Sequence, residues 1–275
     1  MRVIDLHVHA FPDKVAGGAL ANLEKQTGYA PSFDGTLAGL RASMDLAGVE
    51  SSVVQPVATR AESVAGINDW AARNQDERVR CFGAMHPDHP DPAAEIARLA
   101  GLGLRGIKLH PEFQRFRPDE DRMAPVYEAL VRHGLALFFH AGADIAIDTV
   151  SSSPAVFARV LDAYPDLRVA LAHMGGWQQW DEVLEVLAGR DVLLETSFTL
   201  GFIGADRFVE LVRAHGAGRV AFGSDGPFGD VAAELRTIGA LELDEDERAA
   251  IMWRNGERFL AGRGVPRRRK SSGAA

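Results

Sequence analysis

The chain has 275 residues, 47% of them hydrophobic and 25% charged, which allows one large α/β domain with a substantial core. The formal net charge of −8 excludes the basic body that nucleic-acid binding needs, and the single cysteine excludes an internal disulfide. The residues after Met1 do not form a basic segment with an apolar signal core, and no apolar run reaches ~18 residues. We therefore expect a soluble cytoplasmic protein that acts on a small molecule, contacts neither nucleic acid nor membrane, and leaves homo-oligomerisation open.

Strand and helix patterns alternate along the chain. The first strand contains Asp5-Leu6-His7-Val8-His9. Because alternate side chains of a strand share a face, Asp5, His7 and His9 are expected to point together. The segment 11–32 is rich in Gly, Ala and polar residues and is predicted to be a long loop. Further strands are predicted at 51–57, 79–85, 104–109, 135–139, 168–172, 192–196 and 219–223, and helices at 36–47, 61–75, 92–101, 121–133, 154–164, 177–188, 206–215, 231–238 and 244–260.

Eight predicted strands, each followed by a helical pattern, indicate a (β/α)₈ barrel in a single domain covering 1–262. Polar residues gather at the carboxyl ends of many strands, and only a closed ring brings all those ends around one centre. The alternative is an open doubly wound sheet. The basic run after Arg263 predicts a solvated, disordered tail over 263–275.

Residues suited to metal binding end five of the predicted strands: His7 and His9, Lys108 and His110, His140, His173, and Asp225. Nitrogen and carboxylate ligands without a thiolate suit Zn²⁺ or a neighbouring transition metal better than Mg²⁺ or Ca²⁺. Such a set leaves a coordination position for water or substrate, as in catalytic sites.

Five motifs carry a family resemblance: Asp5-x-His7-x-His9, Gly106-Ile107-Lys108-Leu109-His110-Pro111, Phe139-His140-Ala141-Gly142, Ala172-His173-Met174-Gly175-Gly176 and Phe222-Gly223-Ser224-Asp225. In this order they resemble the amidohydrolase-related proteins of the metal-dependent hydrolase superfamily, which include the aminocarboxymuconate-semialdehyde decarboxylase-like members. The stretch Trp253-Arg254-Asn255-Gly256-Glu257-Arg258-Phe259-Leu260 is similar to the final helix of that family. The resemblance covers almost the whole chain.

The resemblance implies a distorted barrel whose metal is bound by His7, His9, His140 and Asp225. His173 would bind a second metal or polarise the substrate. Asp225 would accept a proton from metal-activated water and pass it to the leaving group. We expect one firmly bound divalent transition metal, with Zn²⁺ preferred and room for a second.

Lys108 decides how many metals the site holds. An ammonium about 5 Å from a divalent cation is repelled by roughly 6 to 7 kcal/mol at an effective dielectric constant of 20. Three arrangements relieve this repulsion: carbamylation of Lys108 to an anion that bridges two metals, pairing with Glu112 or Glu195, and pairing with a substrate carboxylate. The sequence leaves all three open.

The loop after the fourth strand offers further candidates for substrate binding. His110 could bind the substrate or only its own loop, and Arg115 and Arg117 could grip an anionic group or simply be exposed. Trp177 follows the glycines after His173 and could contact the substrate. Phe11, Phe198 and Phe228 could form an apolar wall.

The main expectation is a hydrolase that uses metal-activated water to cleave an amide, ester or lactone in a small, optionally carboxylated substrate. The alternative is a metal-dependent, non-oxidative decarboxylase or hydratase of an unsaturated or aromatic carboxylic acid. A barrel that only binds a ligand is a third interpretation, although the ligand set lacks no member.

Overall fold

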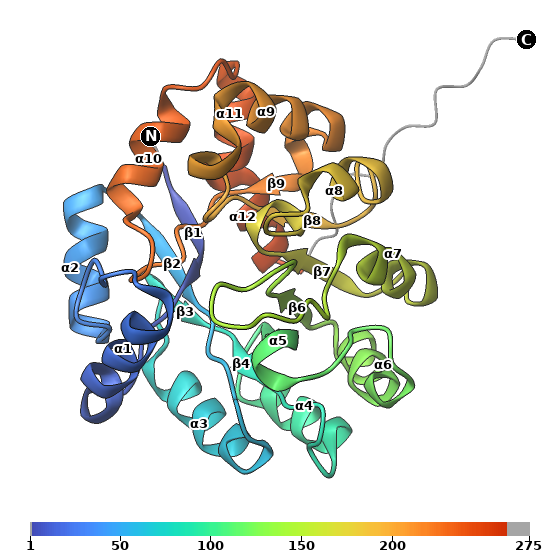
Figure 1. Ribbon diagram of the computed structural model, residues 1–275. Helices are drawn as coiled ribbons and strands as arrows, with labels where there is room; N and C mark the ends of the chain where they lie inside the picture. The colour runs from blue at the N-terminus through green and yellow to red at the C-terminus, as the bar shows by residue number, and fades with distance from the viewer. Residues whose placement is uncertain (1, 263–275) are drawn as a thin grey trace, which may run out of the picture.

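We describe residues 2–262 of a computed structural model, in which helices surround a ring of parallel strands (Figure 1). The predicted tail, 263–275, lies outside the described residues. The strands are β1 Ile4–Val8, β2 Ser51–Val54, β3 Val79–Cys81, β4 Gly83–Ala84, β5 Gly106–Leu109, β6 Ala136–Phe139, β7 Arg168–Leu171, β8 Leu193–Glu195 and β9 Val220–Ala221. The α-helices are α1 Asp13–Thr27, α2 Leu37–Ala47, α3 Val64–Asn74, α4 Pro92–Gly101, α5 Pro111–Gln114, α6 Ala124–His133, α7 Pro154–Ala163, α8 Trp180–Val186, α9 Leu200–His215, α10 Val231–Gly239, α11 Glu245–Ala249 and α12 Asn255–Leu260.

The strands close into the predicted barrel. Every ladder is parallel, and the strands follow one another in chain order, β1 to β3 in one sheet and β4 to β9 in the other. β3 and β4 are two parts of one barrel strand, interrupted at Phe82, whose amide donates to the carbonyl of Val54 at 3.0 Å. The ring closes because the amide of Leu6 donates to the carbonyl of Phe222 at 3.0 Å. An open sheet would leave these two edges apart.

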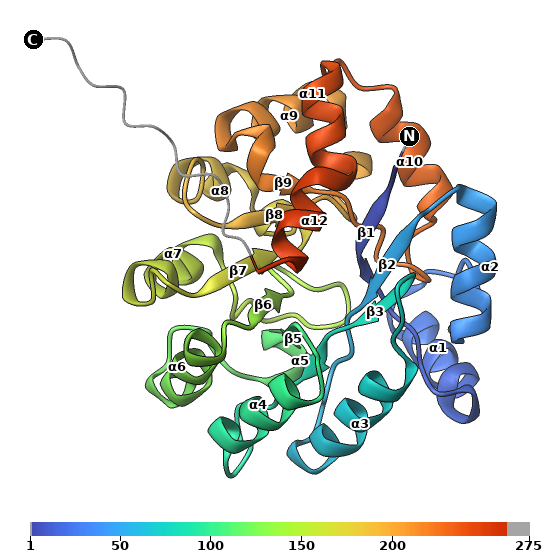
Figure 2. The ribbon, with the colours of Figure 1, turned by 180° about the vertical axis from the view of Figure 1, so that it is seen from behind.

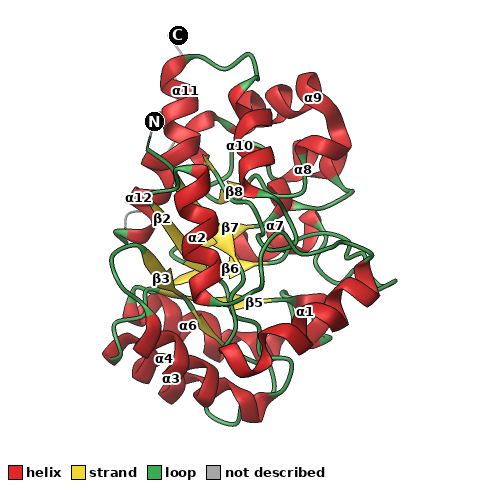
Figure 3. Cartoon of the chain, turned by 90° about the vertical axis from the view of Figure 1, so that its left-hand side faces the viewer, coloured by secondary structure: helices red, strands yellow, loops and turns green. Residues whose placement is uncertain are grey.

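Two apolar layers hold the barrel together. The outer layer lies between the strands and the surrounding helices, as is typical of this architecture. The inner layer consists of Ile4, Leu6, Val53, Phe82, Ala136, Phe138, Ala170, Ala172, Leu193, Ala221, Phe259 and Leu260. The last two belong to α12, which covers the end of the barrel seen in Figure 2. α12 and α1 lie at opposite ends of the barrel (Figure 3). Apolar residues of α12 seal one end, and residues of α1 share a cavity with the polar strand ends at the other.

Local sequence signals explain several helix boundaries. The hydroxyl of Thr36 accepts the amide of Gly39 at the start of α2, and Gly48 ends that helix with a left-handed φ of 71°. Asp91 caps α4 in the same way, with Pro92 at the first helical position. These boundaries agree with the prediction.

Four predicted segments need correction. The expected loop 11–32 contains the fifteen-residue helix α1, which is mostly polar on its surface and fully buries only Ala16 and Leu20. Helix α8 begins at Trp180 rather than at Trp177, because backbone turns occupy the glycine-rich residues before it. Helix α9 starts earlier, at Leu200, with a break at Gly204. The segment predicted at 244–260 is continuous only through a π-helical turn at Ala250–Arg254.

Within residues 2–262, no helix combines the length and the apolar character needed to span a membrane.

Candidate metal centre and cavity

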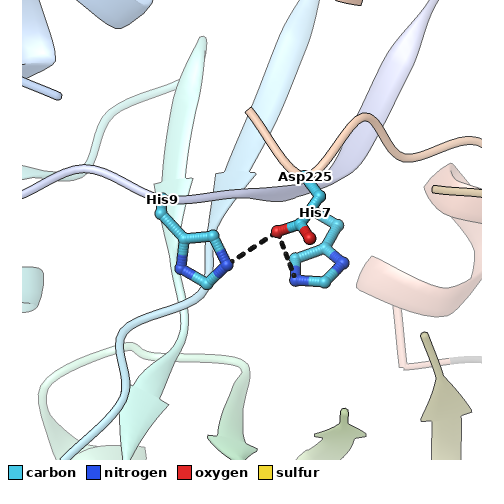
Figure 4. A group of neighbouring side chains, drawn as sticks. All are labelled: His7, His9 and Asp225. Atoms are coloured by element: carbon cyan, nitrogen blue, oxygen red, sulfur yellow. Dashed lines mark ion pairs between the residues drawn. The ribbon is translucent and has the colours of Figure 1, made fainter. Parts of the chain in front are cut away.

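Three side chains from the two strands that close the barrel meet at its carboxyl end (Figure 4). The Oδ1 atom of Asp225 lies 2.9 Å from Nε2 of His9 and 3.3 Å from Nε2 of His7. Asp225 follows β9 in a left-handed conformation, φ 56°, and its amide donates to the carbonyl of His7 at 2.7 Å. A non-glycine residue held at positive φ is strained, and such strain is often found at functional sites. The sequence predicted this group.

Asp5 is not part of the group, contrary to the expectation that it would share a face with His7 and His9. Its carboxylate accepts the amides of His7 and Ser224 and the hydroxyl of Ser224. The pairing of β1 with β2 is irregular between Asp5 and Val8, which breaks the simple alternation of the strand. Asp5 therefore supports the backbone beneath the centre.

Glu195 and Ser197 fix the two deepest histidines. Oε2 of Glu195 lies 2.9 Å from Nδ1 of His7 and also accepts the hydroxyl of Ser197 at 2.9 Å. Nδ1 of His173 lies 3.2 Å from the carbonyl of Ser197, which can only accept, so Nδ1 carries the proton. The Nε2 atoms of His7 and His173 are therefore the ones left for chemistry.

Lys108 is buried on β5, with 1% of its surface exposed, and lies beside the centre. Its Nζ is 3.2 Å from Nε2 of His7 and 4.5 Å from the ring centre of Phe138. Among the described residues, no carboxylate lies within 4.0 Å of this nitrogen, so neither Glu112 nor Glu195 pairs with it directly. A buried cation without a direct counter-ion is costly, and Lys108 is therefore a candidate anion-binding group.

A second group contains His110, His140 and Asp144, whose ligand atoms lie within 4.8 Å of one another. The rings of His110 and His140 are stacked at 4.1 Å, and Nε2 of His110 lies 3.5 Å from Asp144. His140 also contacts His173, with Nδ1 and Nε2 3.2 Å apart. The structure thus places His140, the predicted fourth metal ligand, between the first group and His110.

Glu112 holds the loop that follows β6. Its Oε1 accepts the amides of Ser151 and Ser152 and the hydroxyl of Ser152, at 2.8 to 3.1 Å. Its Oε2 is buried without a hydrogen bond, 3.9 Å from both His110 and His140. The sequence suggested Glu112 and Glu195 only as partners of Lys108, and it did not single out Asp144, which lies four residues after His140.

Burial and neighbouring charges shift the protonation of the site. Burial raises the pKa of Glu112 and of Glu195 to about 7 and lowers that of Lys108 to about 8. Burial would also raise the pKa of Asp225, but His7, followed by the other histidines, holds it well below its usual range. For His7, burial followed by the charge of Lys108 lowers the pKa, which favours the neutral form that can bind a metal.

The donor set fits a divalent cation. With Nδ1–H of His7 donating to Glu195, Nε2 carries a lone pair. It lies 3.2 Å from Nζ of Lys108 and 3.3 Å from Oδ1 of Asp225, which is itself 2.9 Å from Nε2 of His9. Two electron-rich atoms facing each other are stabilised by a cation between them. A carboxylate behind a metal-binding histidine is also a recurring feature of such sites.

A cavity of about 870 Å³ opens above this centre. Its floor contains the polar residues His7, His9, Lys108, His110, His140, His173 and Asp225. Trp177, Phe11, Phe198 and Phe228 all line it, in agreement with the predicted apolar wall. Trp177 is buried, and its indole nitrogen has no hydrogen-bond partner among the described residues.

The two predicted arginines separate. Arg115 lines the cavity, whereas the side chain of Arg117 is 58% exposed and pairs with Asp119 outside it. The prediction that both could face one side required an extended segment. Instead, α5 forms, Arg115 ends it at a φ of 55°, and Phe116 is buried.

Comparisons with solved structures support the fold. The chain is similar to 5-carboxyvanillate decarboxylase from Sphingomonas paucimobilis, with 20% identity, a TM-score of 0.72, and 94% of this chain and 99% of that one covered. It is also similar to an uncharacterised TIM-barrel protein from Bordetella bronchiseptica, with 19% identity, a TM-score of 0.75, and 95% of this chain and 99% of that one covered. A third structure is dihydroxybenzoic acid decarboxylase from Polaromonas sp. JS666, with bound manganese and the inhibitor 2-nitroresorcinol (18%, TM-score 0.71, 94% and 96% covered). These structures share the fold of this chain.

No curated protein matches the sequence. The family model described as amidohydrolase matches residues 4–261. Because that match spans almost the whole chain, and the barrel and its group of histidines agree with it, the chain belongs to the amidohydrolase family.

Proposed function

We propose that the protein is a metal-dependent, non-oxidative decarboxylase of an aromatic or otherwise unsaturated carboxylic acid. The observation that carries this proposal is Lys108, a buried cation on the cavity floor with no carboxylate within 4.0 Å among the described residues. The carboxylate of a substrate would supply the missing counter-ion. The substrates named for the similar solved structures, 5-carboxyvanillate and dihydroxybenzoic acid, support the choice of an aromatic acid.

The surroundings of Lys108 argue against carbamylation around a single metal. Burial lowers the pKa of Lys108 to about 8, whereas Asp225 and then Glu195 act against burial and favour the charged form. A carbamate would place a further anion beside these two carboxylates. With a pKa of about 8, Lys108 is mostly charged at neutral pH, and its ammonium can attract the substrate carboxylate into the cavity.

His7, His9 and Asp225 would hold the cation, with His140 as the predicted fourth ligand. When bound, the cation supplies positive charge that stabilises the negative charge developing on the substrate. Manganese is the first metal to test, since it is present in a similar structure. Asp225 then serves as a ligand that is already ionised.

His173 is placed to supply the proton. In decarboxylation, the bond between the ring carbon and the carboxylate breaks, CO₂ leaves, and the electron pair on carbon takes up a proton. Nδ1 of His173 donates to the carbonyl of Ser197, so the transferable proton would reside on Nε2. Burial lowers the pKa of His173, and the arriving carboxylate opposes that effect by favouring the protonated ring.

The test is to load the purified protein with manganese and incubate it with 2,6-dihydroxybenzoate and 5-carboxyvanillate, and separately with a panel of esters, lactones and amides. We expect CO₂ release from an acid, dependence on the metal, and no hydrolysis. His173→Asn should retain metal and bind the acid while losing turnover by a factor of about 100 or more. His133→Asn, at the end of α6, is a matched control outside the cavity lining.

Metal-dependent hydrolysis of an ester, lactone or amide, without CO₂ release from any acid, would contradict the proposal and restore the hydrolase interpretation.

A further inference from the structure

We infer that the cavity takes an acid carrying a bulky apolar group, which extends from the metal centre along aromatic walls to the inner face of α1. The acid end of this inference rests on the proposed function, whereas the apolar end rests on the cavity alone.

Aromatic rings stand beside the histidines of the floor. The ring centre of Phe228 lies 5.8 Å from that of His9, and the ring centre of Phe198 lies 6.3 Å from that of His173. Phe113 lies 4.2 Å from His110 in the same way. A flat, apolar group leaving the floor would therefore find three aromatic rings in the cavity lining.

Phe198 continues the wall outward. Its ring meets that of Tyr29, just beyond α1, edge-on at 5.4 Å, and both rings line the cavity. Phe198 follows β8 at a φ of 49°, a left-handed conformation that is strained for a non-glycine residue. A residue held in that conformation to present a ring toward a cavity is a candidate specificity determinant.

One face of α1 forms the outer wall. Ala19, Asn22, Leu23 and Gln26 line the cavity and follow the i, i+3, i+4, i+7 spacing of a single helix face. Ile67 and Trp70 of α3 also line it. No Asp, Glu, Lys or Arg from α1 or α3 lines the cavity among the described residues. This end is uncharged, and Ala19, Leu23, Ile67 and Trp70 give it apolar surface beside the amides of Asn22 and Gln26.

The charged residues that line the cavity all come after β4 in the sequence, and none belongs to α1 or α3. They are Lys108, Glu112, Arg115, Asp144 and Asp225. The cavity is thus divided between a charged part and an uncharged part.

The volume exceeds what a one-ring acid needs. The 870 Å³ lie toward the upper end of pockets that bind drug-sized ligands. A single-ring acid at the floor would leave most of this apolar surface hydrated. A second ring or a branched apolar substituent would displace that water.

The test compares equilibrium affinities of the manganese-loaded protein for two pairs of ligands, measured by quenching of tryptophan fluorescence, since Trp70 and Trp177 line the cavity. The acids are benzoate and 4-phenylbenzoate, and the neutral pair is benzamide and 4-phenylbenzamide. We expect the extended member of each pair to bind about 10- to 100-fold more tightly. In Ala19→Phe, which fills the α1 end, that gain should fall below about 3-fold, with the affinity for benzoate unchanged.

Ala21→Phe is the matched control, because it places the same ring on the same helix outside the cavity lining, and it should keep the full gain. Ile67→Ala tests the facing wall and should reduce the gain without adding bulk. Equal affinities within both pairs, or equal behaviour of Ala19→Phe and Ala21→Phe, would overturn the inference. If both extended ligands gain but acids bind no better than amides, the apolar site stands and the proposed recognition of an acid fails.

Discussion

Oε2 of Glu195 at the end of β8 lies 2.9 Å from Nδ1 of His7 on β1, and both side chains are completely or almost completely buried. The carboxylate passes close to Gly223, where a Cβ atom would clash with it. The glycine after β9 therefore allows one barrel strand to orient a histidine on another. This contact selects the tautomer of His7 that carries its proton on Nδ1. The lone pair is then on Nε2, the atom that faces Asp225.

Replacing Glu195 with Gln should weaken metal binding by about 10- to 100-fold, because the variant loses the negative charge that orients and polarises His7. Affinity is measured by competition with a chelator of known strength. Glu128→Gln, on the exposed face of α6, is the control and should bind metal normally. Unchanged affinity in the Glu195 variant would show that His7 needs no carboxylate support.

His7→Ala and Asp225→Asn should both reduce turnover by several orders of magnitude with the barrel still folded, since both residues lie at strand ends rather than in the apolar layers. The two variants should differ in metal content. His7→Ala loses a nitrogen ligand and should be depleted of metal, whereas Asp225→Asn keeps an oxygen and should largely retain it. Elemental analysis beside circular dichroism makes the comparison. Near-normal turnover in the Asp225→Asn variant would show that the reaction does not require the negative charge of Asp225.

Arg115 and Arg117 should no longer be expected to act alike. Arg115→Ala should lower kcat/KM for an acid substrate by about 10-fold, since its side chain lines the cavity. Arg117→Ala should stay within about 2-fold of the parent, because its partner is the nearby Asp119. Metal content should not change in either variant. A larger loss of kcat/KM in Arg117→Ala than in Arg115→Ala would indicate that the carboxylate of the substrate binds outside the cavity.

Cys81 provides a check on the barrel wall. The thiol lies at the end of β3, and burial raises its pKa to about 12. At pH 8 the folded protein should therefore react only slowly with a thiol reagent, whereas in the denatured protein one thiol per chain should react rapidly. Fast reaction of the folded protein would mean that this strand opens readily.

Most of the fold could be predicted because the strands are short apolar runs and several helices begin or end at clear caps, such as Asp91-Pro92 and Gly48. Helix α1 was missed because glycines and polar residues hide its weak periodicity. The spacing of Ala16, Ala19, Leu20 and Leu23 was nevertheless a usable signal.

Parts of the site could likewise be predicted from the sequence, and other parts could not. The group of His7, His9 and Asp225 followed from position, because residues at the carboxyl ends of parallel strands converge. The position of Asp5 could not be predicted, because an irregularity in strand pairing is set by tertiary contacts rather than by the local sequence pattern. Asp144 lies in a loop whose path depends on the buried carboxylate of Glu112, so only the folded structure brings it to His110.

The most direct measurement of the proposed reaction is proton NMR of the product formed by the manganese-loaded protein in D₂O. Decarboxylation predicts that the carbon losing CO₂ carries one deuterium, with one CO₂ released per product and with Lys108→Met losing at least about 100-fold in kcat/KM for the acid. Product that forms without CO₂ and without carbon-bound deuterium, from an ester, lactone or amide, would contradict the account.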